Sequence, residues 1–289
     1  MEPENALEIF HLSKRYPLFS LDDVSFSLER GTIMGFIGRN GAGKSTTLKA
    51  LFNIVHPDSG DVSFFSLPYV GNERAIKNQT AFSAGAFEYY QNKTLKSITE
   101  VTRRFYEKWD DAVYAAYLKK FGLDESKTPA ELSEGMKVKY SLCLALSHNA
   151  ELLILDEPTS GLDPVSRGEV LEIFLSLVEQ GKTILFSTHI ISDLEKCADS
   201  ITYIQKGRIL ASCPVAEFQN RYKIAHFAHQ ADIDECSLNI KGIRRAKEGF
   251  TALIEKQSGA DKQPVDESAA TLEQIMVHLE AEREVVAHV

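Results

Sequence analysis

The run Gly38-Arg39-Asn40-Gly41-Ala42-Gly43-Lys44-Ser45 constrains the fold of this chain more than any other segment. It matches G-x-x-x-x-G-K-S and joins residues 33–37, which predict a strand, to residues 44–53, which predict a helix. In that setting the glycines let several backbone N–H groups face one phosphate chain, and the helix N-terminus adds its positive dipole end. Lys44 then supplies charge for the β- and γ-phosphates, and the Ser45 hydroxyl can bind Mg²⁺. The plainer alternative is a glycine-rich turn before a helix.

A second motif places two adjacent carboxylates, Asp156 and Glu157, after the apolar strand predicted at 152–155. Ligands of open α/β sheets bind at the carboxyl ends of the strands. There Asp156 can hold Mg²⁺, and Glu157 is placed to polarise an attacking water. An isolated Asp-Glu pair after a strand is usually a solvated turn. After a phosphate-binding loop, the pair indicates nucleotide hydrolysis instead.

Two further motifs allow both a structural and a functional interpretation. His189 ends the apolar strand predicted at 183–187, where it could donate to a γ-phosphate and hold the attacking water, although an isolated histidine is more often structural. The run Leu132-Ser133-Glu134-Gly135-Met136 opens a predicted helix. Ser133 is an N-cap in the structural interpretation, and the run is a second anion-binding helix N-terminus in the functional one.

Strands and helices alternate through most of the chain, which predicts an α/β fold with a mostly parallel sheet. Residues 80–146 have almost no strand pattern and predict an inserted helical subdomain. The expected strands are 7–12, 24–28, 33–37, 61–65, 152–155, 183–187, 201–204 and 208–211, and the expected helices are 44–53, 98–121, 135–147, 165–180 and 191–198.

The character of the sequence changes after residue 222. Residues 240–254 predict a small antiparallel unit, 258–268 a polar linker, and 271–284 an amphipathic helix. The expected domains are therefore 1–222, which contains the helical subdomain at about 80–146, and 223–289, a small α+β extension.

Composition narrows the possible functions. The net charge of −9 and the absence of a basic stripe argue against a nucleic-acid partner. The four scattered cysteines form no C-x-x-C pair, which argues against a zinc site and fits a reducing cytosol. No apolar run approaches the roughly eighteen residues needed to span a bilayer, and the acidic N-terminus does not resemble a signal peptide. We expect a soluble protein, and any membrane role must come through a partner.

Together and in this order, these motifs resemble the ATPase cassette of ABC transporters over about residues 5–222. They correspond to the Walker A, signature and Walker B motifs, followed by the D-loop at Ser160-Gly161-Leu162-Asp163 and the switch histidine. The resemblance implies a P-loop NTPase core of ABC ATPase type, with ATP and Mg²⁺ as cofactors. It implies catalytic roles for Glu157, His189 and Lys44, Mg²⁺ binding by Ser45 and Asp156, and nucleotide binding by Tyr16, Gly38, Asn40, Gly41, Gly43, Lys44, Ser45, Thr46, Ser133, Gly135 and Asp163.

The same resemblance implies partners. Two cassettes pair head to tail and enclose ATP between the P-loop of one and the signature of the other, so Ser133 and Gly135 would serve the opposite site. Asp163 would lie at the dimer seam, and Tyr16 would stack on adenine unless it is a core tyrosine. A homodimer is favoured over a heterodimer. The other partner would be a transmembrane permease, which holds the subunit at the cytoplasmic face of the membrane.

This chain departs from the family pattern in its signature. The family usually has LSGGQ, whereas Glu134 places a carboxylate near the expected γ-phosphate, which is unfavourable unless the side chain turns outward. Met136 lacks the hydrogen bonds that a glutamine would make.

A second departure falls on the loop after the strand that precedes the helical subdomain. The usual Gln or Glu of the family falls near Gly85, so either Glu88 or, as we favour, a water takes its place as the Mg²⁺ ligand. The nearby rings of Phe87, Tyr89 and Tyr90 suit a docking surface for the permease, or alternatively the core of the subdomain.

Three stretches, residues 105–110, 132–137 and 271–276, resemble a bacterial exporter subfamily linked to antimicrobial or cytotoxic peptides, including exporters of phenol-soluble-modulin type. One alternative is a soluble ABC protein that acts on ribosomes or nucleic acid. Another is a nucleotide-gated regulator with little turnover. For residues 223–289 the hypothesis is a dimer-stabilising or regulatory role.

Overall fold

The computed structural model describes residues 4–83, 90–234, 238–256 and 266–285. The chain divides into two compact units, residues 1–212 and 213–289, and each is described by itself. The expected boundary after residue 222 lies inside the second unit. The division falls earlier because α8 (Val215–Asn220) contacts β11 (Tyr222–Phe227), and because the N–H of Lys256 donates to the carbonyl of Arg221.

The centre of the first unit is a six-stranded sheet with the order β10-β9-β3-β8-β7-β6. The pairs β6–β7, β7–β8, β8–β3 and β3–β9 are all parallel. Every residue of β3, β7 and β8 is buried, as expected for parallel strands covered on both faces. The strands are β3 (Ile33–Ile37), β6 (Thr80–Ser83), β7 (Leu152–Asp156), β8 (Thr183–Thr188), β9 (Ser200–Gln205) and β10 (Arg208–Pro214).

Helices follow these strands and cover the sheet. The ring of Phe174 on α6 packs 5.6 Å from that of Phe186 on β8, and α1 contacts β7. The helices are α1 (Lys44–Leu51), α2 (Glu73–Gln79), α6 (Pro164–Glu179) and α7 (Ile191–Cys197). The predicted alternation of strands and helices around a mostly parallel sheet is confirmed.

A second, antiparallel sheet packs on the same core. Its order is β2-β1-β4-β5, with β1 (Asn5–Arg15), β2 (Ser20–Glu29), β4 (Ser59–Phe64) and β5 (Leu67–Pro68). Apolar side chains of this sheet, among them Leu7 and Phe64, join one buried cluster with Leu48 of α1 and Ile154 of β7. The cluster also includes Ala42 of the loop between β3 and α1.

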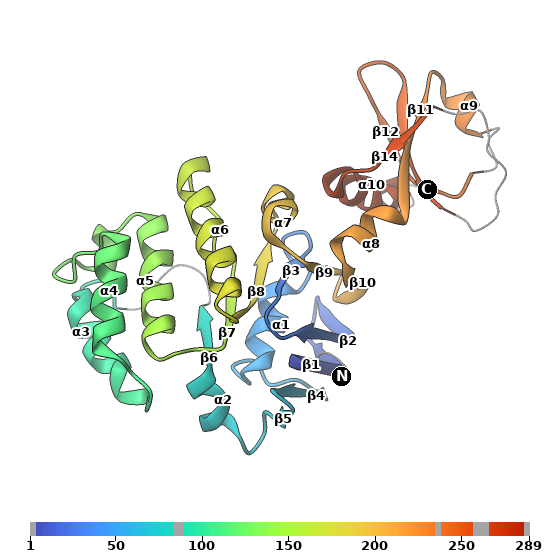
Figure 1. The fold of residues 1–289 in the computed structure, drawn as a ribbon. Coiled ribbons are helices and arrows are strands. Elements are labelled where there is room, and N and C mark those ends of the chain that lie inside the picture. Colours follow the sequence, from blue (N-terminus) through green and yellow to red (C-terminus); the bar gives the residue numbers. More distant parts are fainter. Residues whose placement is uncertain (1–3, 84–89, 235–237, 257–265, 286–289) are drawn as a thin grey trace. The chain divides into compact units, whose positions relative to one another are not determined.

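The helical subdomain contains α3 (Leu95–Thr102), a 3₁₀ turn η1 (Arg103–Phe105), α4 (Asp111–Phe121), a second turn η2 (Pro129–Glu131) and α5 (Glu134–Ser147). Figure 1 shows α3, α4 and α5 grouped beyond β6, the edge strand of the six-stranded sheet. Three buried hydroxyls tie these helices together, because Thr99 Oγ1 lies 2.9 Å from Tyr114 Oη and 2.8 Å from Tyr140 Oη.

Two expectations for this region were wrong. The helix predicted at 98–121 is interrupted, because Asp110 caps a new helix by accepting hydrogen bonds from the N–H groups of Ala112 and Val113 at 2.8 and 3.1 Å. The stretch 80–146 begins with a strand, β6, which pairs with β7 in parallel; the family resemblance implied a strand before Gly85, but the residue pattern did not predict it. A strand of only four residues is too short for a clear alternation pattern.

The second unit is a four-stranded antiparallel sheet with the order β12-β13-β11-β14. Its remaining elements are α9 (Gln230–Asp234), β12 (Ile240–Arg245), β13 (Phe250–Glu255), β14 (Asp266–Ala269) and α10 (Leu272–Val285). The antiparallel unit and the amphipathic helix are confirmed. The linker predicted at 258–268 is wrong at its end, where β14 pairs with β11. Among the described residues, no helix is long and apolar enough to cross a membrane.

Candidate active site

The loop between β3 and α1 has a backbone that requires glycine. Gly43 caps α1 with a φ of +116°, and a Cβ there would lie 2.7 Å from Leu21 Cδ2 and 2.9 Å from Phe19 Cζ. At Gly38 an added Cβ would meet the carbonyl oxygen of Ile204 at 2.3 Å. Larger residues at these two positions would therefore displace the loop or the side chains packed against it. No side chain caps α1, so its first N–H groups are available to an anion.

The side chain of Lys44 lies inside this loop, with 5% of its surface exposed. Its Nζ donates to the carbonyl of Gly38 at 2.7 Å and lies 3.3 Å from Oε1 of Glu157. The structure thus brings the P-loop cation and the Walker B carboxylate into direct contact. A buried ammonium needs such hydrogen-bonding and anionic partners. A phosphate oxygen would be a further partner, with a negative charge like that of the Glu157 carboxylate.

Glu157 also contacts His189. Oε2 of Glu157 lies 2.7 Å from Nδ1 of His189, so one carboxylate bridges the lysine and the histidine. Glu157 adopts a φ of +50°, unusual for a residue with a Cβ. The two adjacent carboxylates have different partners, because Glu157 contacts Lys44 and His189 whereas Asp156 accepts from Ser187.

A serine at the end of β8 joins this strand to β7. Ser187 Oγ donates to Oδ1 of Asp156 at 2.5 Å and accepts from the N–H of Glu157 at 2.8 Å. The same hydroxyl therefore orients both neighbours. Its contribution was missed from the sequence, where the only signal was its place directly before Thr188 and His189.

A cavity of about 570 Å³ collects most of the predicted cofactor residues. Its lining includes Asn40, Gly41, Gly43, Lys44, Ser45, Thr46, Glu157 and His189. An adjoining cavity of about 580 Å³ is lined by Tyr16 and shares Leu18, Phe19 and Gly41 with the first. Tyr16 is 42% exposed, which argues against a core tyrosine. Its ring stacks on that of Phe19 at 6.4 Å, and Nζ of Lys14 lies 5.9 Å from its centroid.

Gly38, Asp156, Ser133, Gly135 and Asp163 do not line the Lys44 cavity, and the last three of these lie at the starts of α5 and α6. Ser133 caps α5 by accepting from the N–H of Met136 at 3.3 Å. Asp163 caps α6 by accepting from the N–H groups of Val165 and Ser166 at 2.9 and 3.1 Å. Hydrogen bonds from Ser166 hold the pKa of Asp163 below its ordinary value. Gly135 is buried in the first turn of α5. The N-cap interpretation of Ser133 is therefore confirmed, and its anion-binding role stays a prediction.

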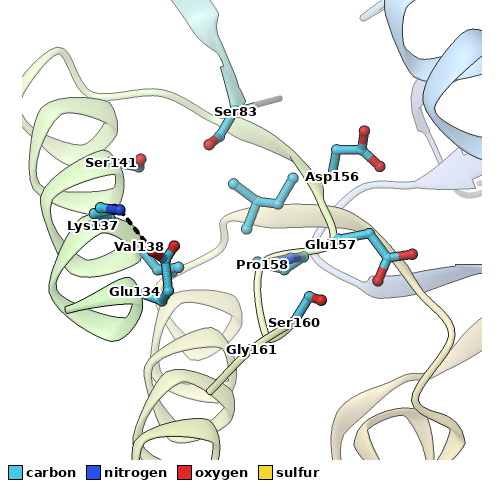
Figure 2. A pocket seen from close by; sticks show the side chains of 11 residues that line it. Ser83, Glu134, Lys137, Val138, Ser141, Asp156, Glu157, Pro158, Ser160 and Gly161 are labelled. Carbon is cyan, nitrogen blue, oxygen red and sulfur yellow. Dashed lines mark hydrogen bonds and ion pairs between the residues drawn. The ribbon is translucent and has the colours of Figure 1, made fainter. Parts of the chain in front are cut away.

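The unusual Glu134 of the signature is paired within its own helix. Its Oε1 accepts from Nζ of Lys137 at 2.6 Å, an i,i+3 pair on α5. Figure 2 shows this pair facing the loop of Pro158, Ser160 and Gly161 across a cavity of about 340 Å³. Lys137 offsets the negative charge of Glu134, which the sequence analysis expected near a γ-phosphate. The i,i+3 spacing of the two residues was the sequence signal from which this pair could have been predicted.

The predicted docking aromatics are described only in part. Gly85, Phe87, Glu88 and Tyr89 lie outside the described residues. Tyr90 is 66% exposed, so this ring does not belong to the subdomain core.

Comparison with known proteins shows the family. The profile of the ABC transporter family matches residues 21–160. The chain is 32% identical to the bacitracin transport ATP-binding protein BcrA of Bacillus licheniformis, over 70% of this chain and 67% of that protein. It is 35% identical to a Nod factor export ATP-binding protein I of Burkholderia orbicola, over 71% and 69% of the two chains. The chain belongs to the ABC transporter family.

A solved structure supports the same conclusion for this ABC subunit. An ATP-binding subunit of an ABC transporter superposes with a TM-score of 0.67 and 31% identity, over 74% of this chain and 92% of that one. The expected fold class, the ABC ATPase cassette, is thereby confirmed. This ABC subunit is an ATP-binding protein of the class that hydrolyses ATP to drive transport.

Proposed function

We propose that this ABC subunit binds Mg²⁺-ATP around Lys44 and Ser45, hydrolyses it with Glu157 and His189, and powers export of antimicrobial or cytotoxic peptides through a separate permease. One observation carries the catalytic part. Lys44, Glu157 and His189 form a continuous contact chain, at 3.3 and 2.7 Å, inside the cavity that the P-loop lines.

The contact chain suggests how the site works. A bound triphosphate would compete with Glu157 for the Lys44 ammonium, because both are anions within reach of the same cation. Glu157 would then be free to accept a proton from a water in line with the γ-phosphate. His189, on the other side of the carboxylate, would donate to a γ-phosphate oxygen and stabilise the charge that develops there.

The residues present fit Mg²⁺ delivered with a nucleotide. Ser45 lines the cavity, and the carboxylate of Asp156 is held in one orientation by Ser187. The described residues contain no group of three or more His, Cys, Asp or Glu that could hold a metal alone. Mg²⁺ usually takes one or two protein ligands and completes its shell with phosphates and waters. When bound, it would neutralise charge between the β- and γ-phosphates.

The proposal includes a head-to-tail homodimer. It is supported by the position of Ser133 and Asp163, which cap helices outside the Lys44 cavity of their own chain, and by the symmetry of most self-assembling proteins. We expect the Glu157→Gln variant to form dimers only when ATP is present, as measured by light scattering. Monomers at saturating ATP would contradict the homodimer and favour a different cassette as partner.

The proposal also includes a permease that holds the subunit at the cytoplasmic face of the membrane. Exposed apolar side chains occur on the helical subdomain, with Val101 52% and Phe105 74% exposed, besides Tyr90. Two relatives are named for bacitracin transport and Nod factor export, which supports export.

Co-expression with candidate permeases tests this proposal. We expect co-purification with one of them and ATPase activity stimulated by it. Stimulation by ribosomes or nucleic acid would instead favour a soluble ABC protein that acts on them. Nucleotide binding with negligible turnover would favour a nucleotide-gated regulator.

For the second unit we propose a dimer-stabilising or regulatory role. It has its own buried cluster, including Ala225, Phe227, Ala252 and Ile254. Truncation after residue 212 should weaken dimerisation or alter the ATPase rate. Unchanged assembly and turnover would refute this role.

A further inference from the structure

A buried carboxylate lies behind the candidate active site. Asp193 on α7 is completely buried, and it is four residues beyond His189 in the chain. Its Oδ2 accepts a hydrogen bond from Oγ1 of Thr159 at 2.6 Å. Thr159 is also fully buried and follows Glu157 by two residues. A buried charge is unfavourable unless it is paired and hydrogen-bonded, so a carboxylate at this place requires a reason.

The other oxygen of Asp193 faces an arginine that does not quite reach it. Oδ1 of Asp193 lies 3.9 Å from Nε of Arg167 on α6. Both atoms are buried, and neither has a hydrogen-bond partner in the described part of the chain. A charge-assisted hydrogen bond is normally about 2.7–2.9 Å long. A closure of about 1 Å would therefore satisfy two buried atoms at once.

These two residues hold both ends of the loop that follows Glu157. Asp193 holds Thr159 through its side chain, and Nη2 of Arg167 donates to the carbonyl of Leu162 at 3.3 Å. Ser160, between these two points, lines the Lys44 cavity. The loop ends at Asp163, the residue proposed for the dimer seam. The pair therefore connects that seam to the helix that begins just after His189.

We propose that Asp193 is a positioning residue for ATP hydrolysis. It holds the Thr159–Leu162 segment against α7, and its contact with Arg167 closes to a hydrogen-bonded ion pair in the nucleotide-bound dimer. The Asp193–Arg167 pair then has two states, one without and one with the hydrogen bond. Contact of a second copy with the Thr159–Leu162 segment favours the hydrogen-bonded state, in which Glu157 and His189 are aligned. This inference rests on the hydrolytic roles proposed for those two residues.

Turnover measurements on four variants test the pair. Asp193→Asn keeps the shape and an acceptor for Thr159 but removes the charge, and Arg167→Met removes the other charge. We expect each to lower kcat about tenfold while KM for ATP changes by less than about twofold, because alignment of groups already in place is lost. The double variant should be no slower than either single variant, and Arg167→Lys should retain more activity than Arg167→Met.

Glu169→Gln is the matched control. Glu169 lies on α6, as Arg167 does, and its half-exposed carboxylate pairs with Lys139 of α5. Loss of this pair should leave kcat within about twofold of the unmodified protein. Melting temperatures of all variants identify any loss that comes from unfolding. Asp193→Asn with unchanged kcat, or with a rise in KM alone, would overturn the proposal. Multiplicative losses in the double variant would do the same.

A second readout does not depend on turnover. The coupling between residues 167 and 193 in a double-mutant cycle of unfolding should be larger with saturating Mg²⁺-ATP than without nucleotide. Equal coupling in both conditions means a purely structural pair and overturns the inference. If the unmodified protein binds ATP without hydrolysing it, the proposed catalytic roles fail, and the nucleotide dependence of the coupling still decides the role of Asp193.

Discussion

The contact of Glu157 with both Lys44 and His189 leads to an unusual expectation for Glu157→Gln. With an effective dielectric constant of about 20, charges 3.3 Å apart attract each other by about 5 kcal/mol before desolvation is counted. In the absence of nucleotide, the Glu157 carboxylate pairs with Lys44. An incoming phosphate must therefore compete with this carboxylate for the ammonium. The glutamine variant removes that competition and keeps the shape of the side chain, so ATP should bind at least as tightly as it does to the unmodified protein.

Turnover should respond in the opposite direction. An amide cannot accept the proton of the attacking water, and a positioned general base typically contributes about 10²–10⁴-fold, or about 3–5 kcal/mol of the barrier. Phosphate release measures kcat, and titration with a fluorescent nucleotide measures Kd. Glu107→Gln is the control, because Glu107 of the helical subdomain is an exposed carboxylate that pairs with Arg74 of α2. A kcat of Glu157→Gln within about tenfold of the unmodified protein would refute the general-base role, and weaker ATP binding would refute the competition.

Three further predictions concern the loop and the subdomain. Lys44→Ala should raise the Kd for ATP at least about 30-fold, equivalent to about 2 kcal/mol, in the same nucleotide titration; binding within a few-fold of normal would show that the loop backbone suffices. Gly43→Ala should destabilise the fold by about 1–3 kcal/mol in urea unfolding, because the added Cβ has no room, whereas Gly41→Ala, with open space around it, should lose less. Burial lowers the pKa of His148 to about 4, so its neutral form is favoured in the folded state and stability should fall by about 2 kcal/mol between pH 7 and 4.5. His148→Phe keeps the stack on Tyr106 and should reduce this pH dependence, and an unchanged dependence would mean that other groups cause it.

Much of the fold followed from local patterns. The strand, loop and helix around Lys44 were predictable because their glycine spacing allows few other backbones, and the buried strands β7 and β8 were predictable because they are continuously apolar. The break before α4 was not, since Asp110 acts through hydrogen bonds to two N–H groups rather than through hydrophobic periodicity. The short strand β6 depends on its neighbour β7 for its pairing.

By itself, the sequence determined the family, the P-loop and the residues proposed to bind phosphate, because each motif demands a local backbone that few other sequences adopt. Only the tertiary structure decided that one carboxylate, Glu157, touches both Lys44 and His189, and that Asp193 stands 3.9 Å from Arg167 without a hydrogen bond. The physical reason is that the direction and burial of a side chain depend on what packs around it. Residues far apart in the chain supply that packing, and no local pattern records their distances.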